Sequence, residues 1–252
     1  MIKSLFSNQV LGCCFILFFT NCSKRETMEV DNETQSVVDY AIADQEFMAL
    51  VSAAARSALA FTVAGIQSYT YVPGPPSMPD GKERSGMLTV KQTGQAKYAG
   101  SQCVFKMINC SSSEISYSCD SIVVTTNETN NDYASFNVKL INGVCKTSGY
   151  SIKYRFDRTF TIYPGFGALY TDVVCYVYGV ASGTNRNNGN FSINVLQGSS
   201  LVKRANCPYI RSGIMELTPE GFKTRSVNFG DGTCDDLATF TVKENTVAFK
   251  LK

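Results

Sequence analysis

The chain contains no histidine and no tryptophan among its 252 residues. Without histidine, Ser-His-Asp and Cys-His catalysis are excluded, and so are zinc sites with histidine ligands. The commonest general base near neutral pH is also missing. The missing tryptophan disfavours a platform for stacking sugar rings, although 13 tyrosines and 16 phenylalanines remain. These absences favour a protein that is not an enzyme and has no cofactor.

Strong charge of either sign is missing as well. The 23 Lys and Arg residues nearly balance the 21 Asp and Glu residues, and the formal net charge is +2. The basic residues form no stripe, which argues against nucleic acid as a partner. Thr, Ser, Asn, Val, Tyr and Phe are plentiful, and this composition favours β structure.

The N-terminal segment has the parts of a secretory signal peptide: Lys3, an apolar run over residues 10–19, and a small polar boundary before Cys22. The apolar run is about half the length that a membrane-spanning helix needs. The segment FFTNC resembles the cleavage box of bacterial lipoproteins, in which the cysteine is acylated and becomes the first mature residue. Phe19 and Asn21 depart from the usual Leu and Gly, Ala or Ser. An ordinary signal peptide cleaved near Asn21 is the alternative.

The composition changes along the chain predict four segments. Residues 1–21 form a lipoprotein signal peptide, and residues 22–34 form a flexible acidic tether. Residues 35–64 form an N-terminal helix, and residues 65–252 form an antiparallel β domain. Lipid on Cys22, of the diacylglycerol and palmitate kind, makes the membrane a partner and anchors the protein permanently. The expected location is the cell outer membrane, with the periplasmic and surface faces both open.

The predicted helix has one mostly apolar stripe at alternating steps of three and four residues. A helix that packs on its own sheet or acts as a stalk is favoured over one that binds a partner or lies on a membrane. Ser36 with Asp39 indicates a weak capping box. The stripe consists of Tyr40, Ala43, Phe47, Leu50, Ala54, Ser57 and Phe61.

After residue 65 the periodicity changes to two, and the clearest strand covers residues 150–162. Arg158 falls on the apolar face of this strand, where we expect a bulge or a sheet margin, with a buried ion pair as the alternative. Hairpins are predicted over residues 209–229 and 238–251. The predicted fold class is mainly β, with an N-terminal α-helix followed by an antiparallel β-sheet or sandwich body.

Ten cysteines are present, and Cys13 and Cys14 leave with the signal peptide. An exported chain meets an oxidising compartment, so disulfides are expected. Cys207 and Cys234 lie at the open end of a predicted hairpin, and we expect them to form a disulfide. The pairing of the other five is left open: Cys103, Cys110, Cys119, Cys145 and Cys175.

Three C-terminal segments resemble a family of uncharacterised Bacteroidota lipoproteins. They are GTNRN at 183–187, LVKRANCPYIRSGIMEL at 201–217 and FGDGTCDDLATFTV at 229–242. The likeness is good from about residue 157 onward. It implies export, lipidation and a β-rich body, but it carries no activity.

Three weaker motifs remain. The triplet at 120–122 resembles a short O-glycosylation motif of exported proteins, with Ser121 as the acceptor. A Gly-rich turn carries hard oxygen ligands that suit calcium, although a tight turn explains the same residues. The calcium candidates are Asn228, Asp231, Asp235 and Asp236. Four basic residues could form a patch for an anionic partner, but a solvated strand face is favoured. They are Lys153, Arg155, Lys203 and Arg204.

The combined signals predict a lipid-anchored cell-envelope protein that binds or scaffolds, with an envelope protein or a glycan as its partner. One alternative is a histidine-independent envelope hydrolase that acts on glycans through carboxylates or a serine. The other is an adhesin or fimbria-like subunit that assembles by strand addition.

Overall fold

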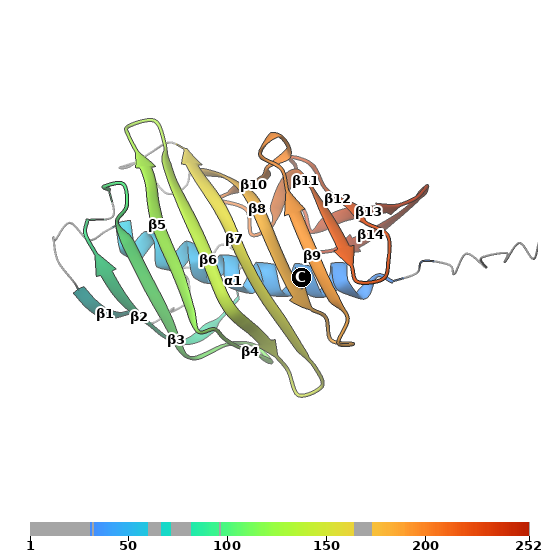
Figure 1. The fold of residues 1–252 in the computed structure, drawn as a ribbon, viewed down its shortest axis with the longest axis horizontal. Helices are drawn as coiled ribbons and strands as arrows, with labels where there is room; N and C mark the ends of the chain where they lie inside the picture. Colours follow the sequence, from blue (N-terminus) through green and yellow to red (C-terminus); the bar gives the residue numbers. More distant parts are fainter. Residues whose placement is uncertain are drawn as a thin grey trace, which may run out of the picture. The chain divides into compact units, whose positions relative to one another are not determined.

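The computed structural model describes residues 31, 33–59, 67–71, 82–95, 97–163 and 173–251. They belong to one compact unit, Asp31–Lys252, which consists of a single helix and one antiparallel sheet of 14 strands (Figure 1). The predicted mainly β fold is therefore confirmed. The predicted signal peptide, Cys22 and the tether up to residue 30 lie outside the described residues. None of the described helical segments combines the length and hydropathy of a membrane span.

The helix α1 spans Gln35–Leu59, close to the predicted range. The strands are β1 (Gln67–Tyr71), β2 (Arg84–Thr93), β3 (Gln102–Ser112), β4 (Ile115–Ser118), β5 (Ser121–Thr129), β6 (Ala134–Lys146), β7 (Ser151–Tyr163), β8 (Val174–Thr184), β9 (Asn190–Val195), β10 (Leu201–Arg204), β11 (Ile210–Pro219), β12 (Arg225–Asp231), β13 (Leu237–Val242) and β14 (Asn245–Lys250).

Neighbouring strands in the sheet are mostly neighbours in sequence. Two positions are each filled by two short strands placed end to end: β4 and β5 lie between β3 and β6, and β9 and β10 lie between β8 and β11. In the described part of the chain, the sheet ends at β1 on one side and at β14 on the other. It is therefore an open sheet with two edges.

The long central strands follow the period of two. In β7, Ile152, Tyr154 and Phe156 are buried while the residues between them are more exposed, as predicted. Strand β6 was not predicted from the sequence, although its buried residues alternate with more exposed ones from Ala134 to Leu140 in the same way.

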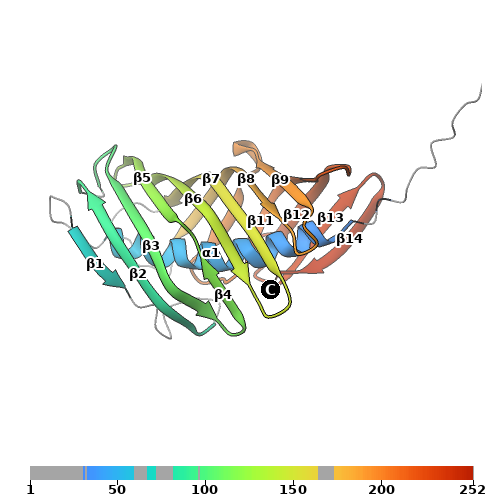
Figure 2. The same cartoon turned by 60° about the horizontal axis from the view of Figure 1, so that its bottom comes forward.

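The helix α1 lies along one face of the sheet, which curves around it (Figures 1 and 2). The first four residues of the predicted stripe, Tyr40, Ala43, Phe47 and Leu50, have no exposed surface. The side chains of Ala54 and Ser57 and the whole of Phe61 lie outside the described part of the chain. Residues on the remaining faces are buried too, including Ile42 and Met48. The helix is thus a core element, packed on its own sheet as favoured above.

Candidate functional site

Between Asp31 and Glu46, the acidic side chains before and within the first half of α1 pair with basic side chains of the sheet and its connections. An apolar interior makes such pairs costly unless each charge is matched and hydrogen-bonded. These pairs, here called the helix clamp, join Asp31 and Glu33 to Arg225, Asp39 to Arg186, Asp44 to Arg158, and Glu46 to Lys82 and Arg84.

The central pair of the clamp is almost completely buried. Arg158 Nη1 lies 2.6 Å from Asp44 Oδ1, and the Tyr154 hydroxyl donates to the same oxygen at 2.7 Å. The expectation that Arg158 marks a bulge or margin is wrong, because β7 is paired along its length on both sides and the bulge lies in β6, after Leu140. The buried ion pair, which was the alternative, is what the structure shows.

Burial and charge together set the protonation of this cluster. Burial alone would lower the pKa of Arg158, but the Asp44 carboxylate raises it, so the guanidinium remains charged. Burial raises the pKa of Tyr154 far above its usual value, and Asp44 adds to this effect. Both tyrosine hydroxyls near Asp44 therefore stay neutral, because burial raises the pKa of Tyr40 in the same way.

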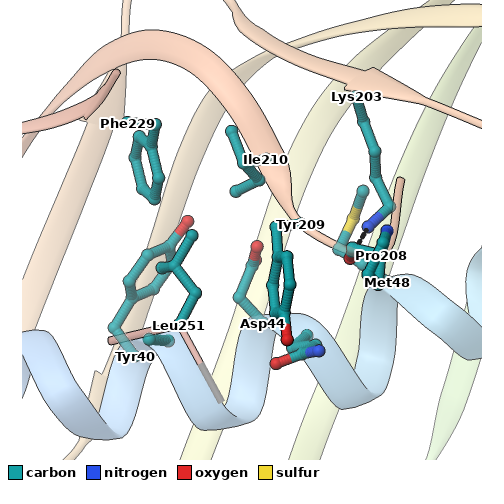
Figure 3. Close-up of a pocket in the computed structure, with 11 residues that line it drawn as sticks. Tyr40, Asp44, Met48, Lys203, Pro208, Tyr209, Ile210, Phe229 and Leu251 are labelled. Carbon is teal, nitrogen blue, oxygen red and sulfur yellow. Dashed lines mark hydrogen bonds between the residues drawn. The ribbon is translucent and has the colours of Figure 1, made fainter. Parts of the chain in front are cut away.

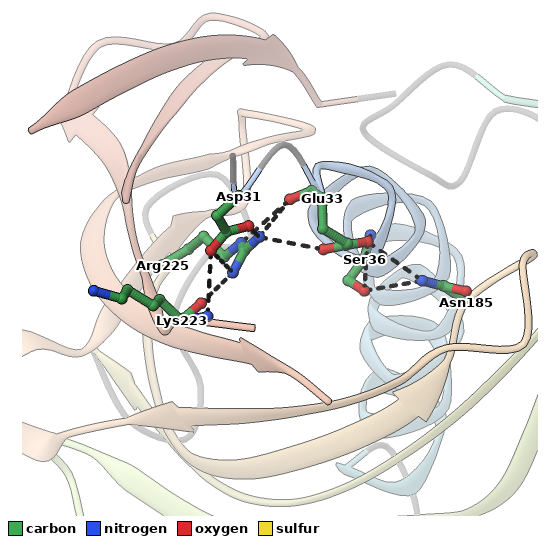
Figure 4. A network of polar contacts seen from close by, with 6 residues as sticks. All are labelled: Asp31, Glu33, Ser36, Asn185, Lys223 and Arg225. Atoms are coloured by element: carbon green, nitrogen blue, oxygen red, sulfur yellow. Dashed lines mark hydrogen bonds and ion pairs between the residues drawn. The ribbon is translucent and has the colours of Figure 1, made fainter. Parts of the chain in front are cut away.

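A second network holds the start of the helix (Figure 4). The guanidinium of Arg225 is ion-paired with Asp31, and its Nη2 donates to the Glu33 carbonyl oxygen at 2.7 Å. Glu33 Oε1 accepts from the Ser36 backbone N–H at 2.8 Å and so caps the helix. The predicted Ser36–Asp39 capping box is not formed. Asp31 and Glu33, assigned above to the tether, make their contacts inside the compact unit.

The turn between β8 and β9 is also part of the clamp. Asn185 donates to Ser36 Oγ at 3.0 Å, and Arg186 lies 2.6 Å from Asp39 Oδ1. The Arg186 guanidinium also stacks 3.9 Å from the centre of the Tyr150 ring. The turn therefore fixes the first helical turns to the sheet, which the turn chemistry alone did not reveal.

A small pocket opens between α1 and the segment that follows β10 (Figure 3). Tyr40 and Asp44 point into it from the helix, and Lys203 Nζ donates to the Pro208 carbonyl at its rim at 2.7 Å. The Tyr40 hydroxyl has no hydrogen-bond partner among the described residues. The pocket is small and has room for about two water molecules. Asp44 is the only carboxylate among its lining residues.

The predicted disulfide between Cys207 and Cys234 is confirmed, with Cα atoms 5.9 Å apart. It joins the segment after β10 to the connection between β12 and β13. The other five cysteines of the body are free thiols. Burial raises the pKa of Cys103 to about 11 and that of Cys175 to about 12, so both thiols are protonated at neutral pH.

The oxygens of the calcium candidates make turn contacts. Asn228 Oδ1 accepts from the Gly230 N–H at 2.9 Å, and Asp231 Oδ1 accepts from the Thr233 hydroxyl at 2.7 Å. Asp235 accepts from the Leu237 N–H, and Asp236 pairs with Lys250. The part of the chain that the structure describes contains no group of three acidic or cysteine side chains placed to hold a metal.

The remaining sequence candidates lie apart. Ser121 is half-buried at the start of β5. Lys203 lines the pocket on the helix side of the sheet, whereas Lys153 and Arg155 are exposed on the opposite face. The four basic residues therefore form no common patch.

No family model matches the chain, and neither a curated protein nor a solved structure shows significant similarity to it. The resemblance to Bacteroidota lipoproteins therefore stays a prediction.

Proposed function

We propose that the chain is a lipid-anchored cell-envelope protein without catalytic activity, which binds or scaffolds at the outer membrane. The main support is the way the chain enters the body. Arg225 holds Asp31 and Glu33, two acidic residues near the end of the segment predicted as the tether. A tether that ends at residue 30 would transmit tension to β12 and not to the end of the helix.

The enclosed helix supports a binding role for the sheet. Over residues 35–51, where side chains are described, α1 is buried on all sides and clamped by ion pairs, so this part of the helix offers no free apolar face to a partner. The sheet face turned away from α1 is accessible. It carries a group of tyrosines, in which the Tyr163 ring lies 5.6 Å from that of Tyr133 and 5.8 Å from that of Tyr176. Exposed aromatic residues with polar tips suit an envelope protein or a glycan as partner.

The hydrolase alternative gains little support from the pocket. Glycosidases place two carboxylates on either side of the scissile bond. The pocket has one carboxylate, Asp44, which already accepts hydrogen bonds from Arg158 and Tyr154. The adhesin alternative is favoured by one observation, the exposed edge strand β14.

The test compares the full chain with a Cys22→Ala variant in the exporting cell. We expect the native protein to carry the mass of acyl chains and to fractionate with the outer membrane, while the variant is released. A Cys14→Ala variant is the matched control and should behave as the native protein, because Cys14 leaves with the signal peptide. Protease treatment of intact cells then assigns the face. A native protein without lipid mass would refute the proposal.

A further inference from the structure

Strand β14 forms an edge of the sheet on which, among the described residues, no further strand lies. Five of its six residues are exposed, and Val247 retains 41% of its surface. An open edge presents unpaired backbone groups to any extended segment of suitable sequence. The question is which segment fits this edge.

The hairpin geometry decides which backbone groups point outward. Lys243 and Glu244 form a two-residue turn, with Lys243 at φ 56°, and Val242 pairs with Asn245. In such a hairpin the pair next to the turn is hydrogen-bonded, and the following pairs alternate. The short contact of 2.9 Å between the hydroxyls of Thr241 and Thr246 fits a non-hydrogen-bonded pair, whose side chains lie closer. Thr246 and Ala248 therefore direct their N–H and C=O groups away from β13.

We propose that β14 pairs antiparallel with β14 of a second copy of this chain, in the register centred on Val247. In this register Thr246 faces Ala248 of the second copy, and these two symmetric pairs exchange the outward backbone hydrogen bonds. Val247 faces Val247 of the second copy in a non-hydrogen-bonded pair. Such pairs bring opposite side chains closest together, so each exposed valine covers the other.

The charges of the hairpin match in the same register. Antiparallel pairing around Val247 places Glu244 opposite Lys250 of the second copy, twice by symmetry. A lysine on an edge strand usually prevents pairing. Here it meets an opposite charge, and Lys250 is accessible because 66% of its side chain is exposed even though it pairs with Asp236. Charge complementarity thus selects this register over its neighbours.

The pairing is a closed two-fold contact. Each copy uses the same six residues, so one contact consumes the β14 edge of both copies and gives a dimer. Repeated head-to-tail addition of β14 to β1 would instead give a filament. If the protein is lipid-anchored as proposed above, confinement to one membrane raises the local concentration of copies and favours the contact.

A cysteine cross-link in the full chain tests the contact directly. Under a mild oxidant, Val247→Cys should form a covalent dimer at least about tenfold faster than Val180→Cys, since only position 247 meets its own copy. Val180 is the matched control, because it is 53% exposed on the interior strand β8. Equal rates for the two variants would overturn the proposal. Cross-linking of position 247 to a different protein would also overturn it.

A charge exchange tests the register. In the Val247→Cys background, Glu244→Lys and Lys250→Glu should each slow dimer formation by about tenfold, because each creates two like-charge pairs. The double variant should restore the original rate, because it restores the opposite charges across the contact. The Lys250–Asp236 pair is still lost in the double variant, so recovery of the rate would show that the slow rates come from the charges across the contact. Failure of the double variant to recover the rate would contradict the Val247 register. These rates are measured whether or not the chain carries lipid, so they fail independently of the proposed anchor.

Discussion

Removal of the Arg158 charge is the perturbation for which the structure gives the largest effect. In an Arg158→Met variant the Asp44 carboxylate stays in the core with only the Tyr154 hydroxyl as partner. Removal of one member of a buried ion pair typically destabilises a protein by about 3–5 kcal/mol, because the other charge is left uncompensated. That loss is a large part of the roughly 5–15 kcal/mol by which a domain is stable.

A second variant removes the other charge of the pair, that of Asp44. Asp44→Asn keeps an acceptor for Tyr154 but leaves Arg158 unpaired, so it should also lower the unfolding free energy by about 3–5 kcal/mol. The double variant buries no net charge, and we expect it to lose only about 1–2 kcal/mol. The measurement is urea unfolding followed by circular dichroism, with the double-mutant cycle evaluated from the four unfolding free energies.

The matched control is the exposed pair formed by Lys139 of β6 and Asp157 of β7, on the face of the sheet opposite to Arg158. Its side chains are about half exposed, and Lys139→Met should cost less than about 1 kcal/mol. If Arg158→Met were as mild as Lys139→Met, or if the double variant were no more stable than the single variants, the clamp would not hold the helix as argued.

Three further effects follow from the same contacts. Replacement of both Cys207 and Cys234 by alanine should lower the unfolding free energy by about 3–4 kcal/mol, because the bridge closes a loop of 27 residues, and equal urea midpoints would contradict this. Gly143→Ala should cost about 1–3 kcal/mol in the same assay, since a Cβ there would lie 2.7 Å from the Tyr154 carbonyl oxygen and 2.8 Å from Phe47 Cζ, whereas an unchanged midpoint would show that both the neighbouring strand and the helix move aside. Burial raises the pKa of the Cys103 thiol from 9.0 to about 11, so the protonated thiol stabilises the fold fully below pH 9, and this stabilisation is lost as the pH rises through 11. In a Cys103→Ala variant, the unfolding free energy should therefore fall less over this pH range than in the native protein. The same fall in both proteins would contradict this.

The elements with strong local signals were predictable from the sequence. The helix, strand β7 and the hairpin of β13 and β14 follow from periodicity, and the disulfide follows from the position of its cysteines next to a hairpin. Strand β6 was missed although its alternation is as regular as that of β7. Short strands such as β9 and β10 carry too few residues for a periodic signal, because pairing with their neighbours places them in the sheet.

The helix clamp could be seen only in part. Arg158 was visible as a charged residue on an apolar strand face, but its partner Asp44 was not identified from the sequence. Asp44 and Arg158 are 114 positions apart in the chain, so the sequence does not show that their side chains lie 2.6 Å apart. The contact of Asp39 with the turn between β8 and β9 likewise depends on the fold of the whole sheet.

Hydrogen exchange of the α1 amides in the membrane-attached, full-length protein tests the central claim most directly. If the helix is locked inside the sheet by the clamp, its amides near Asp44 should exchange only with global unfolding, as slowly as those of β7. The sheet, and not the helix, would then be the surface available to partners. Rapid exchange of α1 while β7 stays protected would show that the helix leaves the sheet in the native protein, and it would make the helix the binding element.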